Sequence, residues 1–125
     1  MSYVVRTAAE SESTTIEEPW GSLRWLASAP IGNAEGVTLG HVTIKAGYSN
    51  PRHSHTTCEE VLYLLRGRLQ HSMGDQTVIL EAGDTLTVAA HVAHHAASIG
   101  DEDAEMIVAY SSGVRDFVAE ATKDE

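Results

Sequence analysis

Histidines and acids gather in one stretch of the sequence, HSHTTCEEVLYLLRG, which covers residues 53–67. His53 and His55 are separated by a single residue, so in a β-strand both side chains point to the same face. Two imidazoles side by side suit one metal ion. The alternative is a surface strand with two exposed histidines, which is the commoner situation for an isolated H-x-H pair.

Further metal donors are available in the sequence. In a barrel interior, where water is scarce, a carboxylate is favoured because it compensates the charge of the ion. Glu59 and Glu60 are the candidates, and only one of them can point inward because they are adjacent. His94, at the start of the run HHAAS, is well placed to add a donor from another strand. The H-x-H pair is therefore not isolated.

The elements that position these residues are predicted to be short strands. Strand-like runs alternate with turn signals at the spacing of an all-β sandwich or barrel. Helical periodicity is nearly absent, and residues 114–119 fit a last strand or a short helix equally well. The expected strands cover residues 22–28, 37–45, 52–55, 60–66, 68–73, 76–80, 85–88, 94–99 and 104–110.

Turn residues indicate how some strands are connected. Gly74-Asp75 has glycine at the first central position, as a two-residue type II′ turn prefers, so residues 68–80 are predicted to form a hairpin. The sequences EAGD and GDED, at 81–84 and 100–103, predict two more tight connections. Residues 1–19 are polar and predict an N-terminal arm, which leaves residues 20–125 as one barrel domain.

With these elements assigned, the histidine-rich stretch resembles the first motif of the cupins, G-x5-H-x-H-x(3,4)-E-x6-G. The final six-residue spacing of that motif selects Glu60 over Glu59 as the acid. Every fixed position is matched, by Gly47, His53, His55, Glu60 and Gly67.

A second cupin motif, G-x5-P-x-G-x2-H-x3-N, is matched in part. Gly83 and His94 occur at the correct intervals. The proline, the glycine and the asparagine of the motif are replaced by Ala89, His91 and Ser98. These departures keep the ligand but leave the conformation of the loop before it open.

The resemblance implies an all-β, double-stranded β-helix (jelly-roll) barrel, which cupins often pair into a homodimer. It also implies one divalent transition-metal ion, Fe, Mn, Ni, Co, Cu or Zn, and the sequence does not choose among these metals. Three nitrogens and one carboxylate leave one or two positions open on a five- or six-coordinate ion, as in catalytic sites. The implied ligands are His53, His55, Glu60 and His94.

Other side chains near the motifs have alternative interpretations. His71, on the following strand, is a candidate acid, base or hydrogen-bond partner of a ligand, and Glu60 could also take a proton. His95 alternates with His94, so it is expected to face away from the metal. Cys58 is predicted to be a small buried hydrophobe. Either an apolar cavity wall or ordinary core is expected for Met73, Met106, Val108 and Tyr110.

Three aromatic side chains outside the ligand set are expected to have less direct roles. Trp20 and Trp25 are predicted to be packing anchors rather than platforms for a substrate. His91 is placed in a loop at the barrel mouth, where solvent exposure is expected and contact with a substrate stays open.

Composition restricts the partners. Eighteen acids and eight basic residues give a net charge of −10, which repels nucleic acid and anionic lipid. No apolar run approaches the ~20 residues of a membrane span, and the N-terminus lacks the pattern of a signal peptide. We therefore expect a soluble, cytoplasmic protein that binds a small-molecule substrate. The early strand-like segment has edges that a partner subunit would cover, which predicts a homodimer.

Three functions fit the implied site, because the cupin scaffold hosts many activities. The preferred one is a dioxygenase that uses oxygen on an enolisable or phenolic substrate, since flavonol-cleaving cupins look similar in using three histidines and one glutamate. The second is a non-oxidative Lewis-acid enzyme, a polyketide cyclase, isomerase or lyase. The third is a cupin that binds a small ligand without catalysis.

Overall fold

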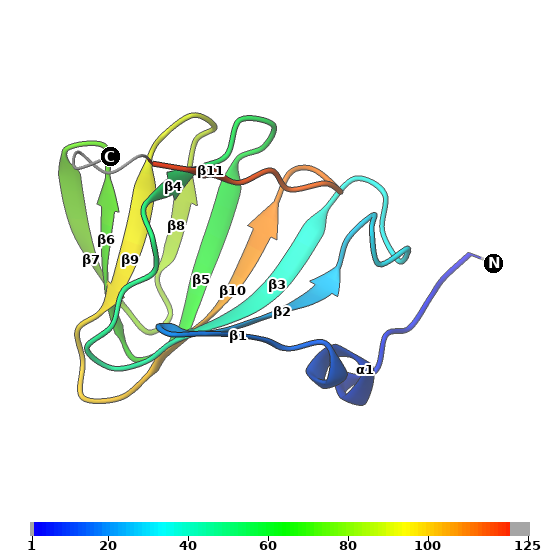
Figure 1. Ribbon diagram of the computed structural model, residues 1–125, viewed down its shortest axis with the longest axis horizontal. Helices are drawn as coiled ribbons and strands as arrows, with labels where there is room; N and C mark the ends of the chain where they lie inside the picture. Colours follow the sequence, from blue (N-terminus) through cyan, green and yellow to red (C-terminus); the bar gives the residue numbers. More distant parts are fainter. Residues whose placement is uncertain (1, 121–125) are drawn as a thin grey trace.

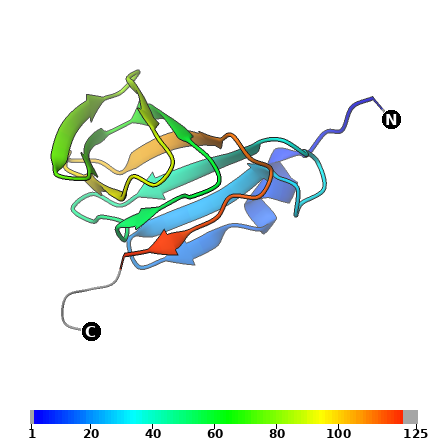
Figure 2. The same ribbon diagram turned by 90° about the horizontal axis from the view of Figure 1, so that it is seen from above.

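Two antiparallel sheets face each other in residues 2–120, the part of the chain that a computed structural model describes (Figure 1). Seen from above, the sheets curve around a common interior (Figure 2). The elements are α1 (Ala8–Ser13), β1 (Ile16–Glu18), β2 (Gly21–Ala27), β3 (Thr38–Ile44), β4 (His53–Ser54), β5 (Glu60–Arg66), β6 (Arg68–Met73), β7 (Gln76–Glu81), β8 (Thr85–Val88), β9 (His94–Ser98), β10 (Ala104–Tyr110) and β11 (Val118–Ala119).

The strand order is that of a jelly roll. One sheet has the order β1-β2-β3-β10-β5-β8, and the other has the order β11-β4-β9-β6-β7. Neighbouring strands within each sheet are antiparallel, and β10 lies between β3 and β5 although it follows both in the chain. The predicted all-β jelly-roll fold is confirmed.

Most strand boundaries follow the sequence pattern closely. The strands expected at 60–66, 68–73, 85–88 and 104–110 have the predicted bounds, and the other five expected strands differ by one residue at one or both ends. β6 and β7 pair with Met73 opposite Gln76, so Gly74-Asp75 is the two-residue turn, and Gly74 has a φ of 58°. The segment 114–119, which the pattern did not decide, contains the short strand β11.

The helix α1 and the strand β1 lie in the segment that the sequence predicted as an arm. α1 begins with a capping box, in which the Thr7 side chain accepts from the Glu10 backbone N–H and Glu10 accepts from that of Thr7. β1 pairs with β2 and forms the edge of the larger sheet. No helix in the described part of the chain is long and apolar enough to cross a membrane.

The core lies between the sheets and is built by strict alternation. Burial alternates along all seven residues of β3 and of β10, as a sheet with one face in the core requires. Ile44, Leu64 and Leu69 are fully buried, and burial of each contributes roughly 1.5–3 kcal/mol. This packed layer fixes the strands from which the functional side chains project.

Gly67 shows why the first motif ends in glycine. Its φ is 87°, a left-handed conformation that favours glycine. A Cβ at this position would lie 2.8 Å from the Ala104 Cα and from the Asp103 carbonyl oxygen. The turn between β5 and β6 therefore requires glycine for both its conformation and its close approach to β10.

His91, which stands where the second motif has glycine, has a backbone conformation that favours glycine. It is the one non-glycine residue among those described with a positive φ, which is 72°. Its backbone N–H donates to the His55 carbonyl oxygen at 2.7 Å. The loop before His94 thus contains a left-handed residue at the position of the motif glycine, and the His91 side chain is exposed as expected.

Replacing His91 with glycine is expected to stabilise the protein by roughly 0.5–1 kcal/mol. A left-handed non-glycine residue costs about 1–2 kcal/mol, and the greater freedom of glycine in the unfolded chain offsets part of the gain. Calorimetry should show a melting temperature raised by a few degrees. Ala90→Gly, at a neighbour with negative φ, is the control and should lower it. A destabilised His91→Gly variant would contradict this explanation.

Candidate metal centre

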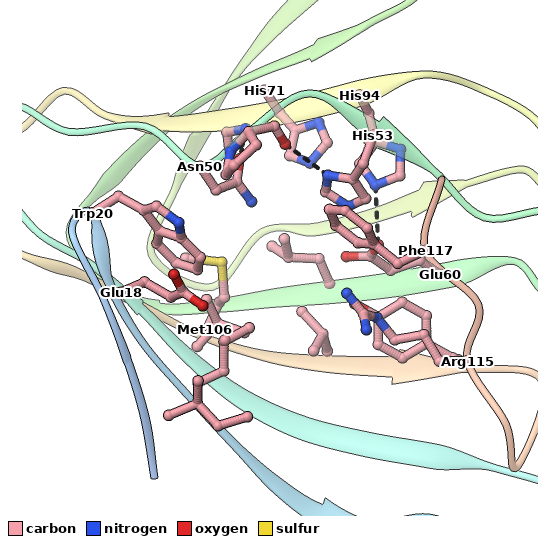
Figure 3. A pocket seen from close by; sticks show the side chains of 18 of the residues that line it. Glu18, Trp20, Asn50, His53, Glu60, His71, His94, Met106, Arg115 and Phe117 are labelled. Carbon is pink, nitrogen blue, oxygen red and sulfur yellow. Dashed lines mark hydrogen bonds and ion pairs between the residues drawn. The ribbon is translucent and has the colours of Figure 1, made fainter. Parts of the chain in front are cut away.

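Four buried side chains converge between the sheets, and they are the four that the cupin motifs single out. His53 lies on β4 with His55 directly after it, Glu60 begins β5, and His94 begins β9. His53 and His94 are opposite each other in the register of β4 and β9. One potential ligand atom from each residue lies within 4.8 Å of all the others. Figure 3 shows three of these side chains, His53, Glu60 and His94, which line a cavity.

Backbone carbonyls fix the orientation of the three imidazoles. A carbonyl oxygen can only accept, so each Nδ1 carries the hydrogen, and each neutral ring presents the lone pair of Nε2 to the cluster. Each ring donates to one carbonyl oxygen: His53 to Pro51 at 2.8 Å, His55 to Asp116 at 2.5 Å and His94 to Val92 at 2.8 Å.

The converging atoms are all acceptors, an arrangement that a bound cation satisfies. Nε2 of His55 and Nε2 of His94 lie 3.3 Å and 3.2 Å from the same oxygen of Glu60. Nε2 of His55 is buried and has no well-directed hydrogen-bond partner in residues 2–120. A proton can satisfy one such pair, whereas a metal ion with bonds of roughly 2.1 Å can satisfy the whole cluster. The residues therefore fit one divalent ion.

Burial and mutual attraction set the charges of the cluster. Burial opposes ionisation of Glu60, but hydrogen bonds and attraction from His55 and His94 outweigh it and lower the pKa of Glu60. Burial lowers the pKa of His53 to about 4. Burial also opposes the charge on His94, yet the hydrogen bond with Glu60 raises its pKa above the ordinary value. Without metal, the cluster therefore holds an ionised Glu60 and takes up its first proton at His94.

Acid is expected to strip the metal in two stages. While one proton on His94 competes with the ion, the apparent affinity should fall about tenfold per pH unit below the pKa of His94. Below about pH 4, His53 also takes up a proton, and the fall should become steeper. Equilibrium dialysis at a series of pH values, followed by metal analysis, measures both slopes. A loading curve that is flat from neutral pH to pH 4 would contradict the assigned ligands.

Stability should follow the same pH window. The folded-state pKa values of His53 and His71 are about 4, below the ordinary 6.5, so protonation favours the unfolded chain. The contribution of these two neutral histidines to the free energy of unfolding is complete above pH 6.5 and is lost as the pH falls through 4. The melting temperature of chelated protein should therefore decrease in this window, and the extra stability of loaded protein should vanish with the metal. Extra stability that persists after metal analysis finds no bound ion would show that metal binding at this cluster is not its source.

The cluster opens onto a cavity of about 290 Å³ with a mostly apolar lining. Met106, Val108 and Tyr110 line it, as one of the two sequence interpretations expected, whereas Met73 is not among the lining residues. Trp20 and Trp25, which were predicted to be packing anchors, line the cavity as well as packing against the core.

His71 is buried in the wall of this cavity beside the cluster. Its ring is stacked on His94, with centroids 5.5 Å apart and planes at 20°. Nδ1 is buried and has no hydrogen-bond partner in the described residues. Burial lowers the pKa of His71 to about 4, so the ring is neutral near pH 7. A neutral imidazole with a free nitrogen can accept a proton.

The neighbours of the four converging residues face elsewhere. Glu59 is exposed while Glu60 is buried. His95 is half-buried on the other face of β9 and lies 3.4 Å from Arg52. Cys58 is buried in the core, as predicted. These placements follow from the alternation of side chains along each strand.

A second group of potential ligands overlaps the first. It contains His55, Cys58 and Asp116. Both carboxylate oxygens of Asp116 already accept hydrogen bonds from the backbones and hydroxyls of Thr56 and Thr57. This group therefore anchors the C-terminal segment to the loop after His55, and it offers no separate metal site.

The C-terminal segment supplies cavity residues that the sequence did not reveal. Phe117 stacks on His53 with ring centroids 4.5 Å apart, and Arg115 projects into the cavity beside it (Figure 3). Asn50 also lines the cavity, and its side-chain oxygen accepts from the Ala96 backbone N–H. The undecided pattern at 114–119 was the one available signal, and nothing in the sequence distinguished Asn50.

The cupin domain family matches residues 40–110, which contain all four converging side chains and His71. The chain belongs to the cupins. Polyketide synthase CurC of Streptomyces cyaneus is 29% identical over 87 residues, which cover 70% of this chain and 56% of that protein. Germin-like protein 3-8 of Oryza sativa subsp. japonica is 29% identical over 92 residues, 70% of this cupin and 41% of that protein. The cupin spans about half the length of these curated relatives.

Solved structures of oxalate enzymes share the fold of this cupin. Oxalate decarboxylase from Bacillus subtilis at pH 4.6 has a TM-score of 0.81 at 20% identity, covering 88% of this cupin and 30% of that chain. Recombinant oxalate oxidase in complex with glycolate has a TM-score of 0.73 at 23% identity, covering 82% of this cupin and 57% of that chain. A further structure of the Bacillus subtilis decarboxylase concerns its Mn(II) centres.

Proposed function

We propose that this cupin is a metal-dependent enzyme that acts on an enolisable or phenolic small molecule. The observation that carries the proposal is the convergence of three imidazole lone pairs and a carboxylate beside the neutral His71, at an apolar cavity that His53, Glu60, His71 and His94 line. His53, His55, Glu60 and His94 are the proposed ligands. A purely binding cupin has no need of a free imidazole in the cavity wall, so this arrangement favours an enzyme.

The residues divide the chemistry between them. A divalent ion held by the four ligands would supply Lewis-acid polarisation of a substrate oxygen. His71 removes the proton from the adjacent carbon or hydroxyl of the substrate, and Glu60 is a second group able to take a proton. The apolar residues of the wall exclude water from the reacting atoms. The proton of the enolisable substrate ends on a ring nitrogen of His71.

We favour an oxygen-using reaction of the dioxygenase class for this site. The support is the ligand set, three histidines and one glutamate, which resembles that of flavonol-cleaving cupins. An oxygen electrode should detect uptake when flavonols are added to protein loaded with Mn, Fe, Co, Ni or Cu. Uptake that requires both the metal and the intact His94 would support the proposal, and no uptake with any of these metals would refute it.

A non-oxidative reaction is the second candidate, and the similarity to polyketide synthase CurC favours it. In this reaction His71 returns the proton to another atom of the substrate, as in a cyclase or isomerase. Substrate should then be converted under anaerobic conditions, with zinc as effective as a redox-active metal. Recovery of an unchanged ligand from the purified protein, without conversion of any substrate, would instead indicate a binding protein.

We also infer that the protein forms a homodimer. Val61, Tyr63 and Leu65 leave a strip of apolar surface on the outer face of β5, and the edge strand β1 of the same sheet is unpaired on one side among the described elements. Partner subunits commonly cover such surfaces. Light scattering should give twice the chain mass at micromolar concentration, and a monomer at all concentrations tested would refute the dimer.

A further inference from the structure

Arg115 lies in an aromatic enclosure within the cavity. Its guanidinium carbon is 4.8 Å from the ring centroid of Trp25 and 5.3 Å from those of Tyr110 and Phe117. The side chain is only partly exposed, and its Nε is buried with no hydrogen-bond partner in residues 2–120. Figure 3 shows the guanidinium pointing into the cavity on the side of Glu60.

The guanidinium lacks an acidic partner, in contrast to most arginines of this chain. No carboxylate oxygen of the described residues lies within 4 Å of it, although the chain carries 18 acids. An arginine removed from water is normally paired with an acid, and its planar fork suits two carboxylate oxygens. The arginines with a carboxylate partner are Arg24, Arg52, Arg66 and Arg68.

Arg115 is close to the proposed ligands without touching them. The ring centroids of Tyr110 and His55 are 5.0 Å apart, and those of Phe117 and His53 are 4.5 Å apart. A single aromatic ring therefore separates the guanidinium from each imidazole. A flat molecule in the cavity can therefore reach the cluster with one oxygen and Arg115 with another group. Glu18 also lines the cavity, but from β1, on the side away from Arg115 (Figure 3).

We infer that Arg115 binds a carboxylate of the substrate, and that the substrate is an aromatic or similarly flat carboxylic acid. This inference rests on the proposed function for the identity of the cavity as a substrate site. The guanidinium donates to the carboxylate, the rings of Trp25 and Phe117 pack against the flat body, and an enolisable or phenolic oxygen faces the cluster. Arg115 thus selects and orients the substrate, while proton transfer belongs to His71.

Two probes of matched shape test the carboxylate preference. The probes 2-naphthoate and the uncharged 2-naphthamide would be titrated into chelated, metal-free protein by calorimetry. We expect wild-type protein to bind the naphthoate about tenfold or more tighter, and Arg115→Gln to remove most of this preference with little effect on the naphthamide. Arg52→Gln, at an arginine paired with Glu120 outside the cavity, is the control and should keep the preference.

Each alternative outcome has a definite meaning. An unchanged preference for the naphthoate in Arg115→Gln overturns the inference. An equal loss of affinity for both probes also overturns it, because Arg115 would then only maintain the structure of the cavity wall. If Arg115→Gln does not fold, Arg115→Lys decides: it keeps the charge but loses the planar fork, so the naphthoate should weaken several-fold and the naphthamide should not. The proposed function would be refuted by a failure to bind metal or to turn over substrate. These titrations use metal-free protein and measure only probe binding, so such a failure would not change their result.

Discussion

Replacing His94 with alanine should remove most of the bound metal, whereas replacing His95 should leave the metal content unchanged. His94 is buried with Nε2 facing Glu60, and His95 lies on the opposite face of β9. Loss of a hydrogen-bond partner of a metal ligand typically costs about 10–100-fold in affinity, so loss of a ligand itself should exceed that. Metal analysis of untagged protein after dialysis measures the difference. A His95→Ala variant that loses the metal while His94→Ala keeps it would reverse the assignment.

Glu59 and Glu60 provide a second matched pair for the same experiment. Glu60→Gln keeps the shape of the side chain but removes the negative charge that compensates the ion, so the metal should bind more weakly. Glu59→Gln should have little effect because Glu59 is exposed. Equal losses at the two positions would mean that charge near the site, rather than direct ligation, controls metal binding.

Replacing His71 with glutamine should lower turnover by about 10²–10⁴-fold, the usual contribution of a general acid or base, while the metal content stays near that of wild type. Glutamine fills part of the same space but cannot accept a proton at neutral pH. His41→Gln is the control, because His41 is half-buried on β3, outside the cavity, and pairs with Glu105 at 3.3 Å. The substrate would be the compound with the highest activity in the oxygen and anaerobic screens.

Two results would contradict the role given to His71. Turnover unchanged in His71→Gln would show that another group moves the proton, with Glu60 as the remaining candidate. Loss of metal together with turnover would show that His71 supports His94 through their stacked rings rather than acting on the substrate. Measuring metal content and turnover on the same samples separates these two possibilities.

The strands of both sheets were predictable from the sequence where buried and exposed side chains alternate and glycines mark the turns. β5 and β6 follow one another across Gly67, and a glycine at this position signals the turn because its φ is positive. Both strands have the predicted bounds. The helix α1 was missed because two alanines and four polar residues (AAESES) give it no large apolar face, although the Thr7 and Glu10 capping box was a visible signal. Local patterns therefore identified the barrel but not the edge that packs against β2.

The cluster and the cavity were predictable to different degrees. His53, His55 and Glu60 come from β4, the residue after it and the start of β5, and the fixed spacing of the motif was sufficient to anticipate their convergence. Arg115 and Phe117 reach the cavity because Asp116 attaches their segment to Thr56 and Thr57, residues nearly half the chain away. Such contacts leave no periodic trace in the sequence, and a segment with two equally good local interpretations gives no indication of where its side chains point.

Anomalous diffraction from crystals of wild-type protein saturated with Mn(II) tests the central claim most directly. The proposed site predicts one strong peak per chain, bonded to Nε2 of His53, His55 and His94 and to a carboxylate oxygen of Glu60. The peak should be absent in crystals of His94→Ala grown in the same way. A peak bonded to other residues, or no peak in saturated wild-type crystals, would contradict the proposed metal centre.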